Sequence, residues 1–147
     1  MIAFATNPRT MSCAHQLLLQ TIVYTPTVDL NGLLLISISA NVNLLETTIV
    51  KRIPKILEIL DDPQEKARLQ NCQTDFTNAL GKLTSAYLAS FLKNYTKAIH
   101  LATEAALINV ECDKEYNTTK HPSPIADVPG KVGRLILISF IIVDEII

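Results

Sequence analysis

The sequence predicts an all-α fold, and its composition and its hydrophobic periodicity are the two observations behind that prediction. Of the 147 residues, 48% are hydrophobic, 5% are aromatic and four are glycine. This composition suits helices better than a sheet-rich fold with many tight turns. Apolar residues also recur every three or four positions along most of the chain, which is the spacing of amphipathic helices. The length is that of one domain that can bury a core.

The first expected helix spans Thr27 to Leu60, and we expect a kink or break near Pro54. The next helix should begin at "DDP", because Asp62 can cap a helix whose first residue is Pro63. It should run to about Leu92. Its apolar residues form a single stripe: Leu69, Cys72, Phe76, Leu80, Leu83 and Tyr87.

Two further helices are expected after residue 92. "KNYTK", residues 93–97, is interpreted as a connection, and the third helix should run from Ala98 to Tyr116. Residues 117–130 contain three prolines and are predicted to form a loop. The last helix, residues 131–147, is apolar on nearly all sides, so we expect it to be the central element of a bundle. Its uninterrupted apolar run is shorter than the roughly 20 residues needed to cross a membrane, and no membrane partner is expected.

Cys72 and Cys112 are expected to lie level in an antiparallel pair of helices. The midpoint of their positions is residue 92, at the proposed turn, and each lies about 30 Å from that turn. A disulfide there would clamp the open end of the helical hairpin and contribute about 2 to 4 kcal/mol. Two buried free thiols are the alternative.

A disulfide would indicate an oxidising compartment and a secreted protein. Asn94 and Asn117 begin two acceptor sequons for N-glycosylation, both in predicted loops. The N-terminus, "MIAFATNPRTMSC", shows no recognisable signal peptide and looks truncated.

Charge and motif content argue against nucleic-acid binding and against catalysis. The net charge is −1, and Lys and Arg residues are scattered singly. His15, His100 and His121 are far apart in sequence, and no nucleophile elbow, phosphate-binding glycine loop or HExxH pattern occurs. His100 and Glu104 lie one helical turn apart, where an ion pair is a more common meaning than a metal site. We therefore expect no catalytic residue, no metal and no cofactor.

Five segments together resemble the plant invertase and pectin methylesterase inhibitor family. They are "NPRTMSC" at 7–13, "DLNGL" at 29–33, "LQNCQTDFTNAL" at 69–80, "KNYTKAIHLATEAALINVECDKEY" at 93–116 and "SPI" at 123–125. The resemblance covers nearly the whole chain, so residues 4–147 are expected to form a single domain of this type.

The resemblance implies an antiparallel up-down four-helix bundle that follows an N-terminal helical hairpin. In the family a disulfide joins the second and third bundle helices, which corresponds to Cys72 and Cys112. Cys13 resembles the second cysteine of the N-terminal pair, but its partner is missing here, so we expect Cys13 to be unpaired. The N-terminal extension would then be a truncated hairpin.

The function that the resemblance implies is that of a secreted, extracellular inhibitor in the plant cell wall, or apoplast. It would bind a carbohydrate-active enzyme non-covalently over the substrate cleft, as a monomer or weak dimer. Pectin methylesterase is the preferred target, because the Pro-Lys-Phe element of many invertase inhibitors is absent from "FLKNYTKA". Inhibition of cell-wall or vacuolar invertase and a non-inhibitory interaction bundle are the alternatives.

The expected hairpin tip offers candidate partner-binding residues, namely Tyr87, Lys93, Tyr95 and Lys97. Exposed aromatic and polar side chains on a stiff support suit an interface. The alternative is that the two tyrosines only pack the end of the bundle. A glycan on Asn94 would shield this same surface.

Overall fold

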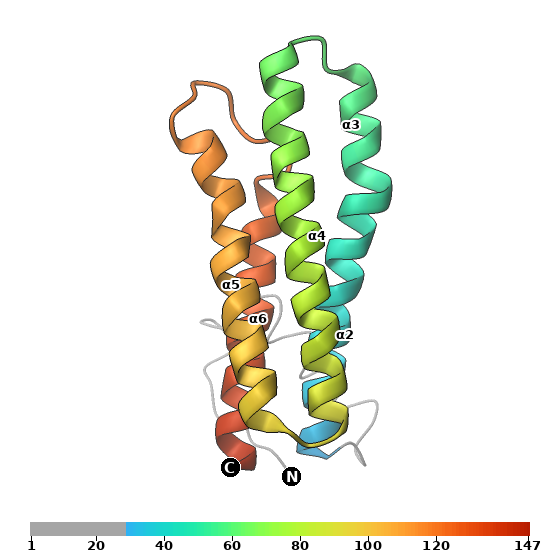
Figure 1. Cartoon of the computed structure of the whole chain (residues 1–147), viewed down its shortest axis with the longest axis vertical. Helices are drawn as coiled ribbons and strands as arrows, with labels where there is room; N and C mark the ends of the chain where they lie inside the picture. The colour runs from blue at the N-terminus through green and yellow to red at the C-terminus, as the bar shows by residue number, and fades with distance from the viewer. Residues whose placement is uncertain (1–28) are drawn as a thin grey trace, which may run out of the picture.

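The computed structural model describes residues 29–147, which fold into four helical rods built from six helical elements, with no β-strand among these residues. The elements are α2 (Leu30–Thr47), a π-helical turn (Thr48–Arg52), α3 (Ile53–Ile59), α4 (Pro63–Phe91), α5 (Tyr95–Asn117) and α6 (Asp127–Ile146). Figure 1 shows them as an antiparallel up-down bundle in which α2 and α3 together make one rod. The expected all-α four-helix bundle is confirmed. The predicted N-terminal extension and Cys13 lie outside the described residues.

The first rod contains an irregular turn where the sequence predicts a disturbance. Proline inside a helix loses one backbone hydrogen bond and its ring collides with the preceding turn. The chain widens into the π-helical turn just before Pro54, and Ile53 N–H bonds to Thr48 C=O. Since the wider turn accommodates the proline, the rod continues as α3 instead of ending there.

Helix α4 begins and ends close to the predicted residues. Asp62 accepts a hydrogen bond from Gln64 N–H at 2.9 Å, and Pro63 occupies the first helical position. At the other end, Lys93 N–H bonds to Ser90 C=O and Asn94 N–H to Ala89 C=O. These two bonds form a Schellman motif, in which Lys93 adopts the left-handed conformation with φ 60°.

Helices α5 and α6 both begin earlier than predicted. Asn94 caps α5 by accepting from Lys97 N–H, so the α4–α5 connection is shorter than 93–97. Helix α6 begins at Asp127, not at residue 131, because Pro129 lies in the first turn. The backbone N–H groups of a first turn have no partner within the helix, so a proline there costs little.

The four rods pack in a ring, with α2 against α4 and α6, and α5 against α4 and α6. The prediction of α6 as a central helix is wrong, because one side of it faces solvent, where Leu137 is 55% exposed. Buried side chains form two clusters along the bundle axis. The cluster around the disulfide contains Leu69, Phe76, Ile125 and Val132 among others, and the cluster nearer the α4–α5 turn contains Leu33, Leu34, Ala86, Ile138 and Ile142 among others.

Buried polar side chains fix how α6 sits between its neighbours. Ser37 donates to Leu135 C=O at 3.2 Å, and Asn41 donates to Val132 C=O at 3.2 Å. Asn109 on α5 donates to Pro129 C=O at 2.9 Å. Because a buried donor without a partner is costly, these bonds favour one position of α6 along its axis.

The rod Leu30–Ile59 meets the length and composition of a membrane-spanning helix, and no other helix among residues 29–147 does. In the bundle it packs against α4 and α6. An apolar helix in a helical core meets the same criteria, so this feature alone does not indicate a membrane protein.

Candidate partner-binding surface

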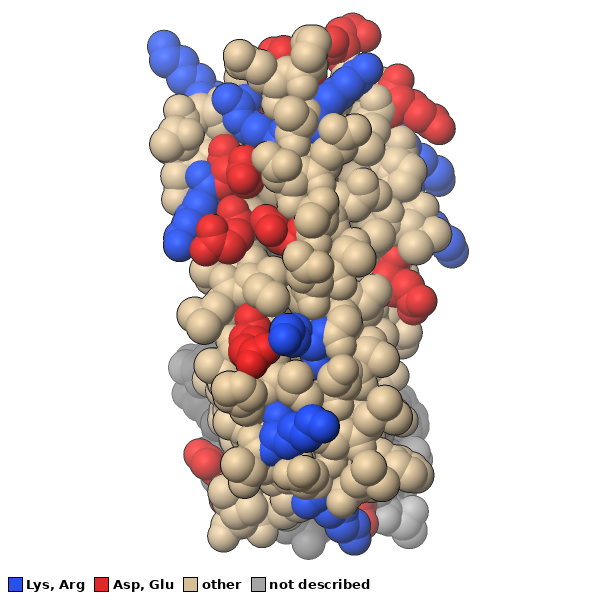
Figure 2. Space-filling model, in the orientation of Figure 1, with Lys and Arg blue, Asp and Glu red and all other residues tan. Residues whose placement is uncertain are grey.

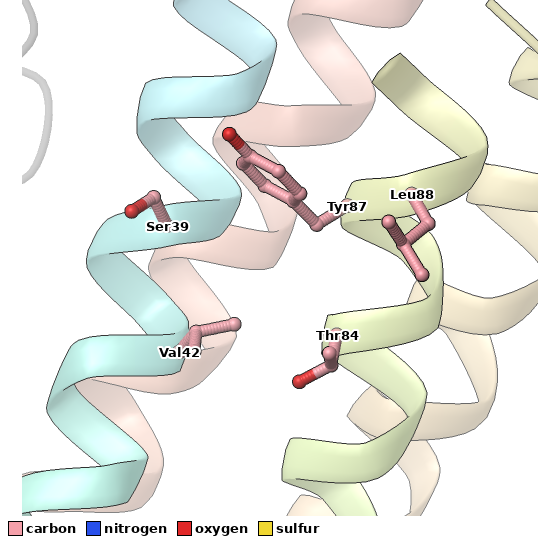
Figure 3. A pocket seen from close by; sticks show the side chains of 5 residues that line it. All are labelled: Ser39, Val42, Thr84, Tyr87 and Leu88. Carbon is pink, nitrogen blue, oxygen red and sulfur yellow. The ribbon is translucent and has the colours of Figure 1, made fainter. Parts of the chain in front are cut away.

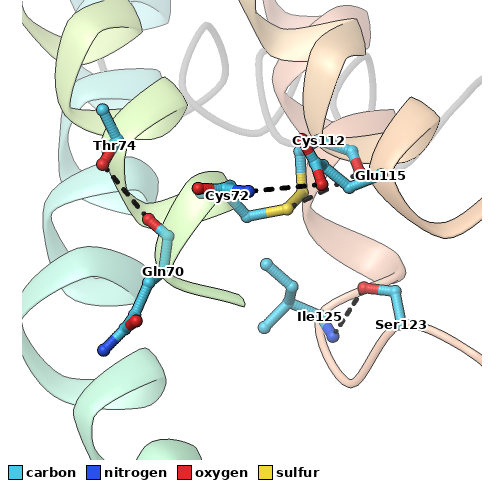
Figure 4. The surroundings of a disulfide bond; sticks show 8 residues. Gln70, Cys72, Thr74, Cys112, Glu115, Ser123 and Ile125 are labelled. Carbon is cyan, nitrogen blue, oxygen red and sulfur yellow. Dashed lines mark hydrogen bonds between the residues drawn. A yellow bond between two sulfur atoms is a disulfide. The ribbon is translucent and has the colours of Figure 1, made fainter. Parts of the chain in front are cut away.

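The disulfide joins α4 and α5 at the position that the sequence predicts. Cys72 and Cys112 are bonded, with their Cα atoms 4.7 Å apart, and both side chains are almost fully buried. Figure 4 shows the bond bridging the two helices, with Ile125 close by in the segment that leads into α6. Ile125 is fully buried, and its N–H donates to Ser123 Oγ at 3.2 Å. The end of the bundle farthest from the α4–α5 turn is therefore held covalently.

Carboxylates gather beside this bond on the outer surface of α4 and α5. Burial raises the pKa of Asp75, and the negative charges of Glu115 and Glu111 raise it further. Asn71 donates to Glu115 at 3.4 Å, and Lys114 pairs with Glu111 at 3.1 Å. No group of three or more potential ligands among residues 29–147 has the geometry of a metal site. These carboxylates are half-buried or exposed, and the negative charges of Glu111 and Glu115 disfavour the ionised form of Asp75.

The two described histidines form no catalytic arrangement with each other. His100 lies 2.7 Å from Glu104, which also pairs with Lys82. The hydrogen bond from Lys82 is the main cause of the lowered pKa of Glu104. His100 and Glu104 thus form a surface contact within an ion-pair network, as expected. His121 lies exposed in the loop before α6, and His15 falls outside the described residues.

The α4–α5 turn carries an exposed apolar cluster on the last turn of α4. Leu88, Phe91 and Leu92 are 58%, 63% and 76% exposed, respectively. Positions separated by three or four residues share one face of a helix, so these side chains lie together. Lys93, in the turn that follows the cluster, and Lys97, in the first turn of α5, are also exposed. We call these five residues the tip surface.

The structure divides the four predicted partner-binding residues into two kinds. Lys93 and Lys97 are exposed, whereas Tyr87 and Tyr95 are half-buried and pack against the core cluster near the turn. Tyr95 also donates its hydroxyl to Asn31 Oδ1 at 2.8 Å, which ties α5 to the first turn of α2. The tyrosines therefore pack the end of the bundle, as the alternative interpretation expects, and remain partly exposed.

A shallow pocket lies between α2 and α4 beside the tip surface. Its volume is about 230 Å³, and its lining residues are Ser39, Val42, Thr84, Tyr87 and Leu88. Figure 3 shows the Tyr87 ring lying between the two helices, with Thr84 and Val42 below it. No ionisable side chain other than the tyrosine lines it, so the pocket suits an apolar side chain of a partner better than a charged ligand.

The exposed cluster Leu88, Phe91 and Leu92 was not among the residues predicted from sequence. Its signal is present in "AYLASFL", residues 86–92, where apolar residues surround the helix instead of forming one stripe. A helix at the edge of a bundle buries only one side. The excess of apolar residues at this end of α4 could therefore have indicated an exposed cluster.

Both predicted glycosylation positions are exposed, at opposite ends of α5. Asn94 precedes the helix and caps it, while Asn117 is its last residue, not a loop residue as predicted.

Figure 2 shows charged side chains gathered over the upper half of the visible face, with fewer over the lower half. The α4–α5 turn therefore lies at the less charged end of this visible face.

Comparison with known proteins identifies the fold. Neither a protein-family model nor a curated protein sequence matches this chain. Among solved structures, the crystal structure of a pectin methylesterase inhibitor from Arabidopsis thaliana is similar, with a TM-score of 0.74 and 14% sequence identity. The match covers 85% of this chain and 83% of that one. The resemblance seen in sequence is therefore confirmed at the level of the fold.

Proposed function

We propose that this protein is a non-covalent inhibitor of a carbohydrate-active enzyme, and that its target is pectin methylesterase. The observation that supports the proposal most is the likeness to a pectin methylesterase inhibitor over most of both chains. The buried disulfide adds support for a secreted, extracellular protein, because such bonds persist in oxidising compartments. Residues 4–147 would form one inhibitor domain, which needs no cofactor.

The tip surface is the proposed contact with the enzyme. Interfaces commonly have an apolar centre with a polar rim. Leu88, Phe91 and Leu92 would supply the centre, and Lys93 and Lys97 the rim. The side chains stand on the rigid ends of two packed helices, so little conformational entropy is lost on binding. Inhibition would follow from covering the substrate cleft, without any chemical step.

The direct test measures pectin methylesterase and invertase activity side by side with added protein. We expect dose-dependent loss of pectin methylesterase activity and no effect on invertase. Loss of invertase activity alone would identify the alternative target. No effect on either enzyme would contradict the proposal and favour a non-inhibitory interaction bundle.

The binding face is tested by charge reversal at the tip. The double variant Lys93→Glu with Lys97→Glu should raise the inhibition constant about tenfold or more, since reversed charges at a rim slow association and weaken binding. The matched control reverses Lys51 and Lys55, two exposed lysines on the first rod away from the tip, and should inhibit like the wild type. Equal loss in both double variants would place the binding face elsewhere. Tyr95 is left intact because it packs the core and bonds to Asn31.

A further inference from the structure

Asn94 occupies a position that combines an acceptor sequence with an accessible turn. Asn94, Tyr95 and Thr96 make the triplet Asn-X-Thr that oligosaccharyl transfer requires. Asn94 and Thr96 are both exposed, whereas the middle residue, Tyr95, is half-buried and turned toward α2 through its bond to Asn31. The Schellman motif holds Asn94 in the turn between α4 and α5, where its N–H bonds to Ala89 C=O. The folded chain therefore leaves room for a bulky group on this side chain.

Of the two polar atoms in the Asn94 side-chain amide, Oδ1 takes part in a hydrogen bond within residues 29–147 and Nδ2 does not. Oδ1 accepts a hydrogen bond from Lys97 N–H at 3.3 Å, which caps α5. Nδ2 makes no hydrogen bond to any of residues 29–147. An N-linked sugar is attached through Nδ2 and leaves Oδ1 free to accept. Glycosylation at Asn94 is thus compatible with the helix cap.

We propose that Asn94 carries an N-linked oligosaccharide that covers the tip surface and reduces its access to partners. The donor would be a lipid-pyrophosphate-linked oligosaccharide: Nδ2 displaces the lipid pyrophosphate from the anomeric carbon of the first sugar and loses one proton. The glycan root, Asn94, directly follows Lys93 in the chain and accepts a hydrogen bond from Lys97 N–H, and the apolar cluster Leu88, Phe91 and Leu92 lies two to six residues before it. The attachment is independent of the proposed function, but its inhibitory consequence rests on that function.

The second sequon provides an internal control. Asn117 is separated from Asn94 by the 23 residues of α5, a distance of roughly 35 Å. A glycan on Asn117 would be attached at the opposite end of α5, near the loop that leads into α6. We therefore expect the sequon at Asn94, and not the one at Asn117, to affect the tip surface.

The experiment uses the full chain secreted from a eukaryotic host that performs N-glycosylation. Thr96→Ala removes the sequon but keeps the Asn94 cap, Thr96→Ser keeps both, and Asn117→Gln removes the other sequon. After correction for the amino-acid substitution, the intact mass should show the loss of one oligosaccharide in Thr96→Ala and its retention in Thr96→Ser. Release by an amidase should convert Asn94 to aspartate in a peptide map of the wild type. Absence of sugar on Asn94 would overturn the proposal whatever the inhibition assay shows.

Shielding is measured without reference to any target enzyme. Acetylation of Lys93 and Lys97 should be several-fold faster in Thr96→Ala than in the glycosylated wild type, with Lys51 and Lys55 unchanged. Equal rates at the tip lysines would overturn the shielding. Asn117→Gln should leave all four rates unchanged.

Inhibition then tests the functional consequence. If the proposed function holds, Thr96→Ala should inhibit pectin methylesterase several-fold more strongly than the glycosylated wild type and Thr96→Ser. Equal inhibition by the two forms would overturn the regulatory role. If neither form inhibits but the acetylation rates differ as expected, the glycan and its shielding are confirmed, and the proposed function is what fails.

Discussion

The two ends of the bundle are closed by different means. At the end farthest from the α4–α5 turn, the disulfide joins two positions of α4 and α5 that are 40 residues apart in the sequence, and Phe76 and Ile125 belong to the same buried cluster. At the other end the chain itself joins α4 to α5 through the turn at Lys93, and no cross-link is needed. The disulfide therefore lies at the end of the bundle where no turn holds α4 and α5 together. The tip, in contrast, leaves the apolar side chains of Leu88, Phe91 and Leu92 exposed.

The largest expected effect tests how much stability the core at the disulfide end supplies. Phe76→Ala should reduce the free energy of unfolding by about 3 to 5 kcal/mol, because the side chain is fully buried and its removal leaves a cavity. Chemical denaturation of both proteins measures the difference. The matched change at the tip is Phe91→Ala, which removes a 63% exposed ring and should cost far less. Similar losses in both variants would contradict the contrast between the ends.

Removal of the disulfide should have the next largest effect. The double variant Cys72→Ala with Cys112→Ala should lose about 2 to 4 kcal/mol, since the bond restricts the unfolded chain over a loop of 40 residues. Replacing both cysteines avoids leaving one thiol to pair with Cys13. Melting curves under oxidising and reducing conditions measure the effect. A wild type whose melting temperature is the same in both would show that the bond contributes nothing.

The ion pair that joins the first rod to the start of α6 should give a smaller, pH-dependent effect. Arg52 donates to both carboxylate oxygens of Asp127, at 2.7 and 2.9 Å, and to Pro124 C=O. The hydrogen bond from Arg52 lowers the pKa of Asp127 from 3.8 to about 2. Both side chains are 40–45% exposed, so solvent limits the contribution to no more than about 1 kcal/mol.

The sign of that pH dependence follows from the lowered pKa. The unfolded chain binds the proton more readily than the folded one, so the contribution is present above pH 3.8 and is lost as the pH falls toward 2. Asp127→Asn should abolish this part of the dependence in denaturation curves at pH 6, 4 and 2.5.

The contribution of Asp75 to the pH dependence of stability has the opposite sign. Its pKa is raised in the folded protein, so folding favours the protonated form of this carboxyl group. Asp75→Asn should therefore slightly stabilise the protein at neutral pH.

The smallest effect is expected at the tip and concerns the backbone. Lys93 has φ 60°, a conformation that glycine adopts without strain. Lys93→Gly should raise the free energy of unfolding by roughly 0.5 kcal/mol. Lys93→Ala is the matched control, because it removes the same charge but keeps the strained conformation. If both variants have the wild-type stability, the strain at this position is negligible.

Much of this fold follows from local sequence signals. Asp62 and Pro63 mark the start of α4 in sequence and in space, because capping and proline geometry depend only on neighbouring residues. The Cys72–Cys112 bond was also predictable, since antiparallel helices joined by a short turn place equidistant residues side by side. Local rules were less reliable at the starts of α5 and α6. Helix α5 begins three residues before the predicted start because Asn94 caps it, and α6 begins four residues before the predicted start because Pro129 is tolerated in its first turn.

Tertiary packing alone decided which residues form the candidate site. Periodicity shows that α4 has an apolar stripe, but it does not show how far the neighbouring helices extend along it. Tyr87 and Tyr95 pack inward because α2 lies beside them, and Leu88, Phe91 and Leu92 stay exposed because no described helix covers that side of α4. The sequence by itself therefore determined the helices, their order and the disulfide. Burial depends on neighbours that are distant in the chain, so only the assembled bundle could separate the exposed lysines from the packed tyrosines.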